Sequence, residues 1–248
     1  MLTYLPPPDD PEALVARAGE FLAGWLMDDG PPELSWWWQQ DEDWAKEWKK
    51  GLGPREVTER IVTKPSWTDY DAAPGQIVLD IDPQMAFGTG EHATTRGCLR
   101  LLDRAIREGD RVLDVGSGSA ILSVAAARLG AAEVVAVEYD PDSNINAHEN
   151  LVHNGVEDRV RLIEAMADPE FLAGQGTFDL ILATILSGVI RPLLPALRQA
   201  LREEGRLIVS GIMRTERDEV LTSAAAAGFR LGEEDREEEW WSALLLPA

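Results

Sequence analysis

The chain has 248 residues, of which 45% are apolar, and this is enough for one well-buried core with a smaller appendage. Its formal net charge is −21, because 44 acidic residues face only 23 basic ones. A surface of this kind repels free nucleic acid and suits a basic partner, such as a basic protein. Only four of the basic residues are lysines, and an acid excess with few lysines resembles proteins from high-salt cytoplasms.

Membrane insertion, disulfide bonding and metal binding are not expected from the sequence. No run of eighteen apolar residues occurs, and the opening MLTYLPPPDDPEAL lacks the basic and apolar regions of a signal peptide. The single cysteine, Cys98, excludes an internal disulfide, and His92, His148 and His153 show no ligand spacing with it. We therefore expect a cytoplasmic protein without a metal centre.

The first 45 residues predict a small αβ domain. An extended segment at residues 2–5 is followed by a helical pattern that closes before residue 30, and residues 34–38 would supply a second strand. Trp44 and Trp48 are four residues apart, on one face of a helix, and we expect them to pack between this domain and the rest of the chain. Residues 46–70 are predicted to be a linker with a hinge, and residues 71–248 to be the main domain.

A polar loop is predicted between the strand at residues 76–81 and the next helix. Residues 55–70 alternate like a strand that Pro65 ends, and residues 76–81 predict another strand. A glycine-rich loop with two threonines then leads into a predicted helix over 96–106, with Thr94 or Thr95 as its N-cap. Because hydroxyl groups and the amides at a helix N-terminus can donate to a carboxylate, this loop is a candidate to cover a ligand.

The stretch RVLDVGSGSAIL, residues 111–122, predicts a buried strand, a glycine turn and a helix from Ile121 to Leu129. Gly116 and Gly118 would let the backbone approach a ligand closely, although such a turn can also occur in a doubly wound domain without any ligand. A nicotinamide fingerprint would require a third glycine where Ile121 stands. A second apolar run ends in Glu138, which could accept both hydroxyls of a ribose, and this arrangement is typical of S-adenosylmethionine (SAM) methyltransferases.

The rest of the chain alternates strands and helices. Strands are predicted at about 134–138, 159–163, 178–184 and 205–211, and helices at about 143–154, 187–202 and 215–227. Residues 229–246 predict a closing hairpin, with the acidic run 233–239 as a solvated turn. The expected fold class is α/β, with the Rossmann-like doubly wound sheet of a class I methyltransferase.

Four segments carry a family resemblance: DEDWAKEWKK, PSW, MAFGTGEHATT and VLDVGSGSAILSVAAARLGA. Together they resemble the PrmA family, the SAM-dependent methyltransferases of ribosomal protein L11. The resemblance implies a small N-terminal domain that recognises the ribosomal protein and a methyltransferase domain that modifies lysine ε-amines and an N-terminal α-amine. Residues 4–22 resemble only the second half of that recognition domain, so we expect the domain to be truncated.

Site residues follow from the motif and from the resemblance. The resemblance places SAM contacts at Thr95 for the methionine end, Gly116, Glu138 for the ribose, and Thr184 at the methyl-transfer site, while Gly118 would allow close backbone approach. Thr184 is a departure, because the family usually has asparagine there. A further departure is Ala120, where the family tends to have a third glycine, and Glu138 replaces the commoner aspartate.

Three functions remain open. The first is a protein amine methyltransferase that acts on ribosomal protein L11, and we expect it to be a monomer that binds neither nucleic acid nor membranes directly. The second is a methyltransferase of the same fold for another protein or a small molecule. The third is a module that binds SAM or the ribosomal protein without turnover. A lysine that accepts a methyl group must reach the site in its neutral form, and Glu91 and His92 are candidate bases by position alone. We expect Asp114 to order the glycine turn.

Overall fold

A computed structural model describes residues 10–23, 34–35, 51–82 and 86–248. Contacts divide the chain into two units, Met1–Gly51 and Leu52–Ala248. The first unit contains helix α1 (Pro11–Ala23), which matches the predicted helical pattern. The predicted strand at 2–5, most of the one at 34–38, and Trp44 and Trp48 lie outside the described residues. The proposed boundaries of the domains and of the linker therefore stay predictions.

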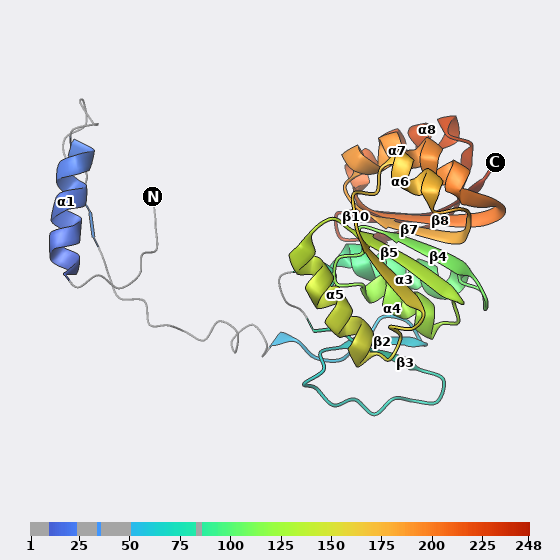
Figure 1. Cartoon of the computed structure of the whole chain (residues 1–248), viewed down its shortest axis with the longest axis horizontal. Helices are drawn as coiled ribbons and strands as arrows, with labels where there is room; N and C mark the ends of the chain where they lie inside the picture. Colours follow the sequence, from blue (N-terminus) through green and yellow to red (C-terminus); the bar gives the residue numbers. More distant parts are fainter. Residues whose placement is uncertain (1–9, 24–33, 36–50, 83–85) are drawn as a thin grey trace. The chain divides into compact units, whose positions relative to one another are not determined.

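In the described part of the second unit, seven strands form the central sheet (Figure 1). They are β4 (Arg111–Val115), β5 (Glu133–Glu138), β6 (Val160–Glu164), β7 (Phe178–Thr184), β8 (Leu201–Met213), β9 (Phe229–Glu237) and β10 (Trp240–Pro247). Their order is β6-β5-β4-β7-β8-β10-β9, with β10 antiparallel to both of its neighbours. The predicted α/β class and the closing hairpin at the sheet edge are confirmed.

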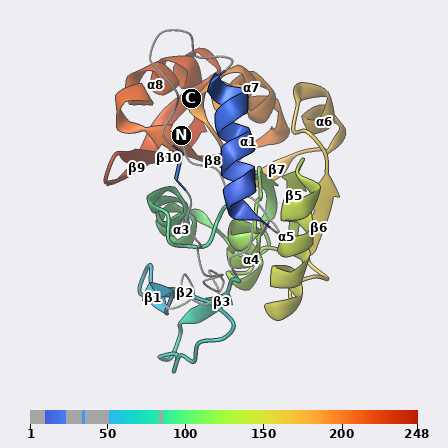
Figure 2. The ribbon, with the colours of Figure 1, turned by 90° about the vertical axis from the view of Figure 1, so that its left-hand side faces the viewer.

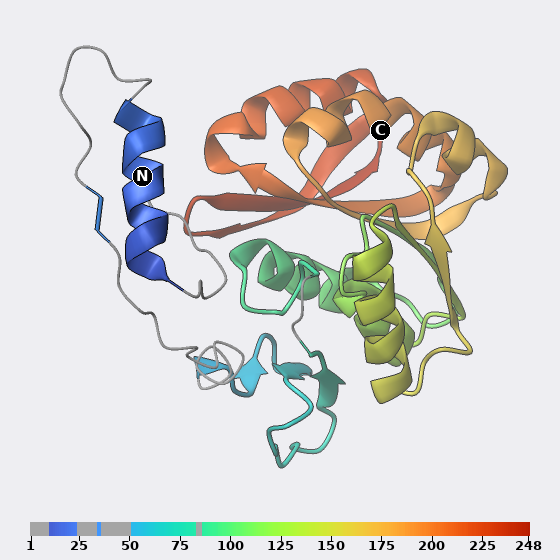
Figure 3. The ribbon, with the colours of Figure 1, turned by 60° about the vertical axis from the view of Figure 1, so that its left-hand side comes forward.

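Helices cover both faces of this sheet, as the green and orange ribbons show in Figure 3. One face carries α3 (Ala93–Ala105), α4 (Ile121–Arg128) and α5 (Pro141–His153). The other carries α6 (Pro169–Gly174), α7 (Ser187–Ala200) and α8 (Arg217–Ala226). Strand residues that alternate along the parallel strands supply two separate cores, with Leu180 and Leu182 in one and Ile181 and Ala183 in the other. The short α6 was not expected from the sequence.

A small three-stranded sheet precedes α3 and is visible below it in Figure 2. Its strands are β1 (Arg55–Glu56), β2 (Ile61–Lys64) and β3 (Ile77–Asp80). The prediction of one strand from residue 55 was wrong, because the backbone amides of Val57 and Thr58 both donate to the Ile61 carbonyl and turn the chain. As expected, the strand stops before Pro65, which has no N–H group to continue the pairing.

Asparagines on α5 tie this small sheet to the glycine turn. The Asn154 side chain accepts from the Asp80 amide (2.9 Å) and donates to the Asp80 carbonyl (2.7 Å). One helical turn earlier, Asn150 accepts from the Asp82 amide (3.0 Å) and donates to the Ser119 carbonyl (2.9 Å). Both asparagines are buried, so the polar backbone groups at this junction are satisfied without water.

The acidic run at residues 233–239 pairs with α3. The ion pairs join Arg96 to Glu237, Arg100 to Asp235 and Glu237, and Arg104 to Glu233, at N–O distances of 2.5–2.9 Å. The prediction of a solvated turn was wrong for residues 233–237, which belong to β9, and the turn itself is Glu238 and Glu239. Four residues of helix rise about 6 Å and two residues of strand about 6.6 Å, so the two charge series stay in step.

We expect the ion pair between Arg100 and Asp235 to stabilise the fold more than the pair between Arg104 and Glu233. The side chains of Arg100 and Asp235 are 24% and 16% exposed, whereas Arg104 and Glu233 are both 49% exposed. Arg100→Met should cost about 1–3 kcal/mol of unfolding free energy because it leaves the part-buried Asp235 without its arginine, while Glu237 keeps Arg96. Arg104→Met should cost about 0–1 kcal/mol.

Urea unfolding at neutral pH measures both variants, and equal losses of unfolding free energy would show that burial does not strengthen these ion pairs.

The arginines also make the stability of the fold depend on pH, because hydrogen bonding from Arg96 holds the pKa of Glu237 below its usual value. This contribution is present above the unfolded-state pKa of about 4.3 and is lost as the pH falls through the lower, folded-state pKa.

Candidate functional site

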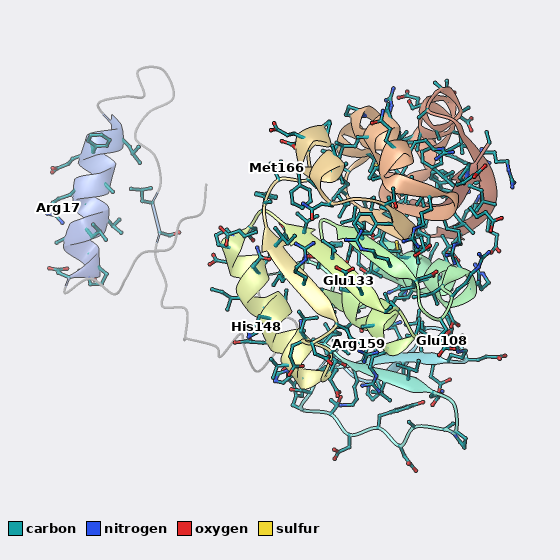
Figure 4. All side chains as sticks on the ribbon, turned by 45° about the vertical axis from the view of Figure 1, so that its right-hand side comes forward. Arg17, Glu108, Glu133, His148, Arg159 and Met166 are labelled. Carbon is teal, nitrogen blue, oxygen red and sulfur yellow. The ribbon has the colours of Figure 1, made fainter. Side chains whose placement is uncertain are left out.

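The carboxyl ends of the parallel strands lie at one edge of the sheet. Figure 4 labels Met166, just beyond the carboxyl end of β6, and shows Glu133 and Arg159 at the opposite edge. Strand β4 lies between β5 and β7, so the strand order reverses beside it. In open α/β sheets, ligands bind outside the carboxyl ends of the strands at such a reversal. The turn that follows β4 is therefore the candidate site.

The glycine turn after β4 requires glycine at two positions. Gly116 and Gly118 have φ values of +72° and +51°. A Cβ atom on Gly116 would lie 2.5 Å from Cγ2 of Ile185, and one on Gly118 would lie 2.5 Å from the carbonyl oxygen of Phe87. Ala120 precedes α4 in the same left-handed region, at φ +63°, where a Cβ atom costs about 1–2 kcal/mol.

The loop at residues 86–92 lies over this turn. The Ser119 amide donates to the carbonyl of Phe87 (2.9 Å), and its hydroxyl donates to the carbonyl of Gly88 (2.5 Å). Gly88 has a φ of +103°, and a Cβ atom there would lie 2.8 Å from Oγ of Ser119. The predicted polar loop and the glycine turn therefore interlock, and each has a glycine where the other approaches.

The helix after this loop begins differently from the prediction. Its N-cap is His92, whose Nδ1 lies 3.3 Å from the Thr94 amide and 2.7 Å from the Thr94 hydroxyl, so the assignment of Thr94 or Thr95 as N-cap was wrong. An imidazole nitrogen takes the place of the usual hydroxyl or carboxylate acceptor. The His92 ring also contacts the rings of Phe87 and Trp240 edge-on, with centroids 5.2 and 5.0 Å away.

Glu138 is fixed beside the glycine turn by backbone amides. Its Oε2 accepts from the Gly118 amide (3.1 Å), and its Oε1 accepts from the amides of Tyr139 (2.9 Å) and Asp140 (3.1 Å). The residue is 9% exposed. Because an ionised carboxylate has about four acceptor positions, it can still accept from a ligand. The expected meeting of the two strand ends is confirmed, since β4 and β5 pair in parallel.

Asp114, the fourth residue of β4, is fully buried. Its Oδ2 accepts from the Ser123 hydroxyl (2.6 Å), which joins the strand end to the first turn of α4. Burial raises the pKa of Asp114 to about 6, and the nearby charge of Glu138 adds to this effect. Within the described residues, Oδ1 of Asp114 and Oγ of Ser117 have no hydrogen-bond partner. These buried polar atoms suit a polar, positively charged ligand group.

Thr184 and Thr95 approach the site from neighbouring elements. Thr184 ends β7, and its carbonyl oxygen would lie 3.9 Å from a Cβ atom on Gly116. Its hydroxyl Oγ1 is 3.1 Å from Sγ of Cys98 on α3. Thr95 is buried in the first turn of that helix. Sequence reasoning missed Cys98 and also Ser119, although a serine within the glycine turn was a signal for the latter.

Large apolar side chains follow the strand ends. Tyr139, Met166, Leu186 and Met213 come within two residues of the ends of β5, β6, β7 and β8, and they are 67%, 62%, 68% and 43% exposed. All four lie at the end of the sheet where the glycine turn is, so they are available for contact with a ligand or a partner. We call these four side chains the apolar rim.

A cavity of about 400 Å³ lies farther along this edge, beyond β8. It is lined by Met213, Arg214, Thr215, Arg217, Arg236, Glu239 and Trp241. Arg217 pairs with Glu234 (2.9 Å) and Asp218 (2.8 Å), and Arg236 pairs with Glu234 (2.5 Å), so two carboxylates balance the two arginines. The glycine turn does not line this cavity, and none of the predicted site residues does.

The strand order with its antiparallel β10, the glycine turn after β4 and the acid at the end of β5 define a class I methyltransferase fold. In the described part of the chain, no cluster of histidine, cysteine and acidic residues could hold a metal ion. No described helix combines the length and the apolar character that crossing a membrane requires.

The chain belongs to the ribosomal protein L11 methyltransferase (PrmA) family, whose model matches residues 4–245. It is 44% identical over 208 residues to the ribosomal protein L11 methyltransferase of Symbiobacterium thermophilum, covering 84% of this chain and 66% of that protein. A second relative, of the same name, from Acetivibrio thermocellus is 37% identical over 244 residues, covering 98% of this chain and 77% of the relative. The resemblance seen in the sequence is confirmed.

The comparison with solved structures agrees. A ribosomal protein L11 methylase from Lactobacillus delbrueckii subsp. bulgaricus superimposes with a TM-score of 0.72 at 31% sequence identity, covering 79% of this chain and 98% of that one. The match to the Symbiobacterium protein spans only about two thirds of that protein's length.

The interlock of loop and turn can be tested with two glycine substitutions. Gly118→Ala places its Cβ atom against the Phe87 carbonyl, and we expect it to cost about 2–4 kcal/mol of unfolding free energy. Gly109 also has a positive φ, +83°, but has open space around it, so Gly109→Ala should cost only about 1 kcal/mol. Urea unfolding compares the two, and equal costs would show that the close approach is unimportant.

Proposed function

We propose that this protein is a SAM-dependent methyltransferase that transfers methyl groups to lysine ε-amines, the N-terminal α-amine, or both, of ribosomal protein L11. The observation that carries the proposal is the hydrogen bond between Glu138 and the Gly118 amide, which holds an acid beside a ligand-binding turn. The family supports the substrate, because the relatives from both organisms are named for ribosomal protein L11.

The residues present fit SAM. Glu138 has one acceptor position left after its three hydrogen bonds from backbone amides, and this position can accept from a ribose hydroxyl. The positive φ values of Gly116 and Gly118 shape the turn at the end of β4, where a ligand would bind. The unpartnered Oδ1 of Asp114 would face the ammonium group of the methionine end, and Thr95 would donate to its carboxylate. Tyr139 and Met166 would contact the adenine, because they follow the strands on the Glu138 side.

The chemistry asks for alignment more than for a strong base. Bound SAM supplies a methyl group activated by its sulfonium. The amine lone pair forms the N–C bond while the S–C bond breaks and its electron pair returns to sulfur, and the amine proton is then lost to water. Thr184 would line the site of transfer. Glu91 pairs with Arg55 (2.6 Å) and His92 caps α3, so both candidate bases already hold structural positions.

The surface supports a basic protein as the substrate. With a net charge of −21, the chain attracts a basic partner over several ångströms, and the apolar rim offers contact beside the site. Leu186, just beyond β7, and Met213, the last residue of β8, would contact the peptide around the acceptor amine. We propose that the protein works in the cytoplasm as a monomer, without binding nucleic acid or membranes.

The direct test is intact-mass analysis of ribosomal protein L11 from the same source after incubation with this protein and SAM. We expect mass increases in steps of one methyl group, in low or in high salt, and none without SAM. Peptide mapping then locates the amines. If the mass is unchanged although calorimetry shows SAM binding in the same buffer, the substrate is wrong.

Glu138→Ala should weaken SAM binding by about 1.5–3 kcal/mol, because it removes a charged hydrogen-bond acceptor. Glu133, at the other end of the same strand, pairs with Arg111 and is 44% exposed, so Glu133→Ala is the matched control and should leave the affinity unchanged. Titration calorimetry measures both variants. Unchanged affinity in Glu138→Ala would mean that SAM binds elsewhere.

A further inference from the structure

A buried cluster of small polar side chains lies against the end of β7. Its members are Thr94, Cys98, Thr184, Ser210 and Ser242. Cys98 and Ser210 are fully buried, and Ser242 is 2% exposed. The Ser210 hydroxyl is 2.7 Å from that of Ser242 and donates to the Thr94 carbonyl (3.2 Å). The cluster therefore joins the start of α3 to the strands beside the candidate site.

Cys98 is the member that contacts Thr184. Its Sγ lies 3.1 Å from the Thr184 hydroxyl. Thr184 and Ser210 are register partners on β7 and β8, so their side chains lie on the same face of the sheet, toward α3. Burial raises the pKa of Cys98 to about 12, which keeps it a neutral thiol that can donate or accept a hydrogen bond.

The contact between Cys98 and Thr184 bears on how the acceptor amine is oriented. A neutral lysine amine must point its lone pair at the methyl group, so its N–H bonds need acceptors at the site of transfer. A threonine offers one hydroxyl there, and that oxygen accepts from the amine only if its own proton is directed elsewhere. A hydrogen-bond partner for the hydroxyl proton supplies that direction, and the Cys98 sulfur, 3.1 Å from the Thr184 oxygen, can be that partner.

We propose that Cys98 is a positioning residue whose sulfur accepts a hydrogen bond from the Thr184 hydroxyl, so that Oγ1 of Thr184 accepts a hydrogen bond from the acceptor amine. The proposal rests on the proposed function, since it concerns the same site. The cysteine acts only through Thr184 and does not touch the substrate.

Sinefungin tests this without the protein substrate. In this SAM analogue, a carbon that bears an amine replaces the methylated sulfur, so its N–H groups lie where the methyl group would be. S-Adenosylhomocysteine has no such amine and is the matched reference ligand. The ratio of the two dissociation constants therefore reports hydrogen-bond acceptors at the site of transfer.

We expect Cys98→Ala to weaken sinefungin binding three- to tenfold and to change S-adenosylhomocysteine binding less than twofold, as measured by calorimetry. Cys98→Ser keeps a partner for the hydroxyl and should restore the ratio to within twofold of the unaltered protein. Thr184→Val should have the same selective effect as Cys98→Ala, and the double variant should lose no more than either single one.

The other outcomes distinguish a failure of this proposal from a failure of the proposed function. Equal weakening of both ligands in Cys98→Ala, or no restoration by serine, would show that the cysteine only fills space. An unchanged ratio would overturn the proposal while leaving the proposed function intact. If neither ligand binds the unaltered protein, both fail. If both bind and the ratio behaves as expected but ribosomal protein L11 is not methylated, only the substrate is wrong.

Discussion

The close approach of two backbone segments is the constraint on which the rest of the site depends. Ser119 in the glycine turn donates two hydrogen bonds to the loop at residues 86–92, and Gly88 and Gly118 leave the space for them. This contact fixes the start of α3 relative to the end of β4. Glu138, which accepts from the Gly118 amide, is held by the same turn. The geometry of the site is therefore set mainly by backbone atoms.

Local signals in the sequence predicted this region well. The glycines, the strand before them and the terminal acid Glu138 lie within 28 residues and obey known turn and sheet rules, so the fold class followed from them, while the site residues stay predictions. Strand and helix positions were also close to those observed. The N-cap was missed because histidine seldom fills that role, and preference statistics favoured the threonines beside it.

Contacts between distant segments could not be predicted. The acids of residues 233–237 resembled a solvated turn because their arginine partners on α3 lie more than 120 residues earlier in the chain. The contact between Cys98 and Thr184 depends on the register of β7 against β8 and on the packing of α3 across both, which no local pattern encodes. Such long-range pairs adapt a common fold to one chain.

We propose that the glycine turn and the loop over it form the ligand site, rather than the arginine-lined cavity beyond β8. Amide hydrogen exchange, measured by mass spectrometry with and without SAM, tests this most directly. We predict slower exchange at residues 116–120, 138–140 and 87–92 when SAM is present, because these backbone segments would contact it. Slower exchange at residues 213–217, with none at the glycine turn, would contradict the claim.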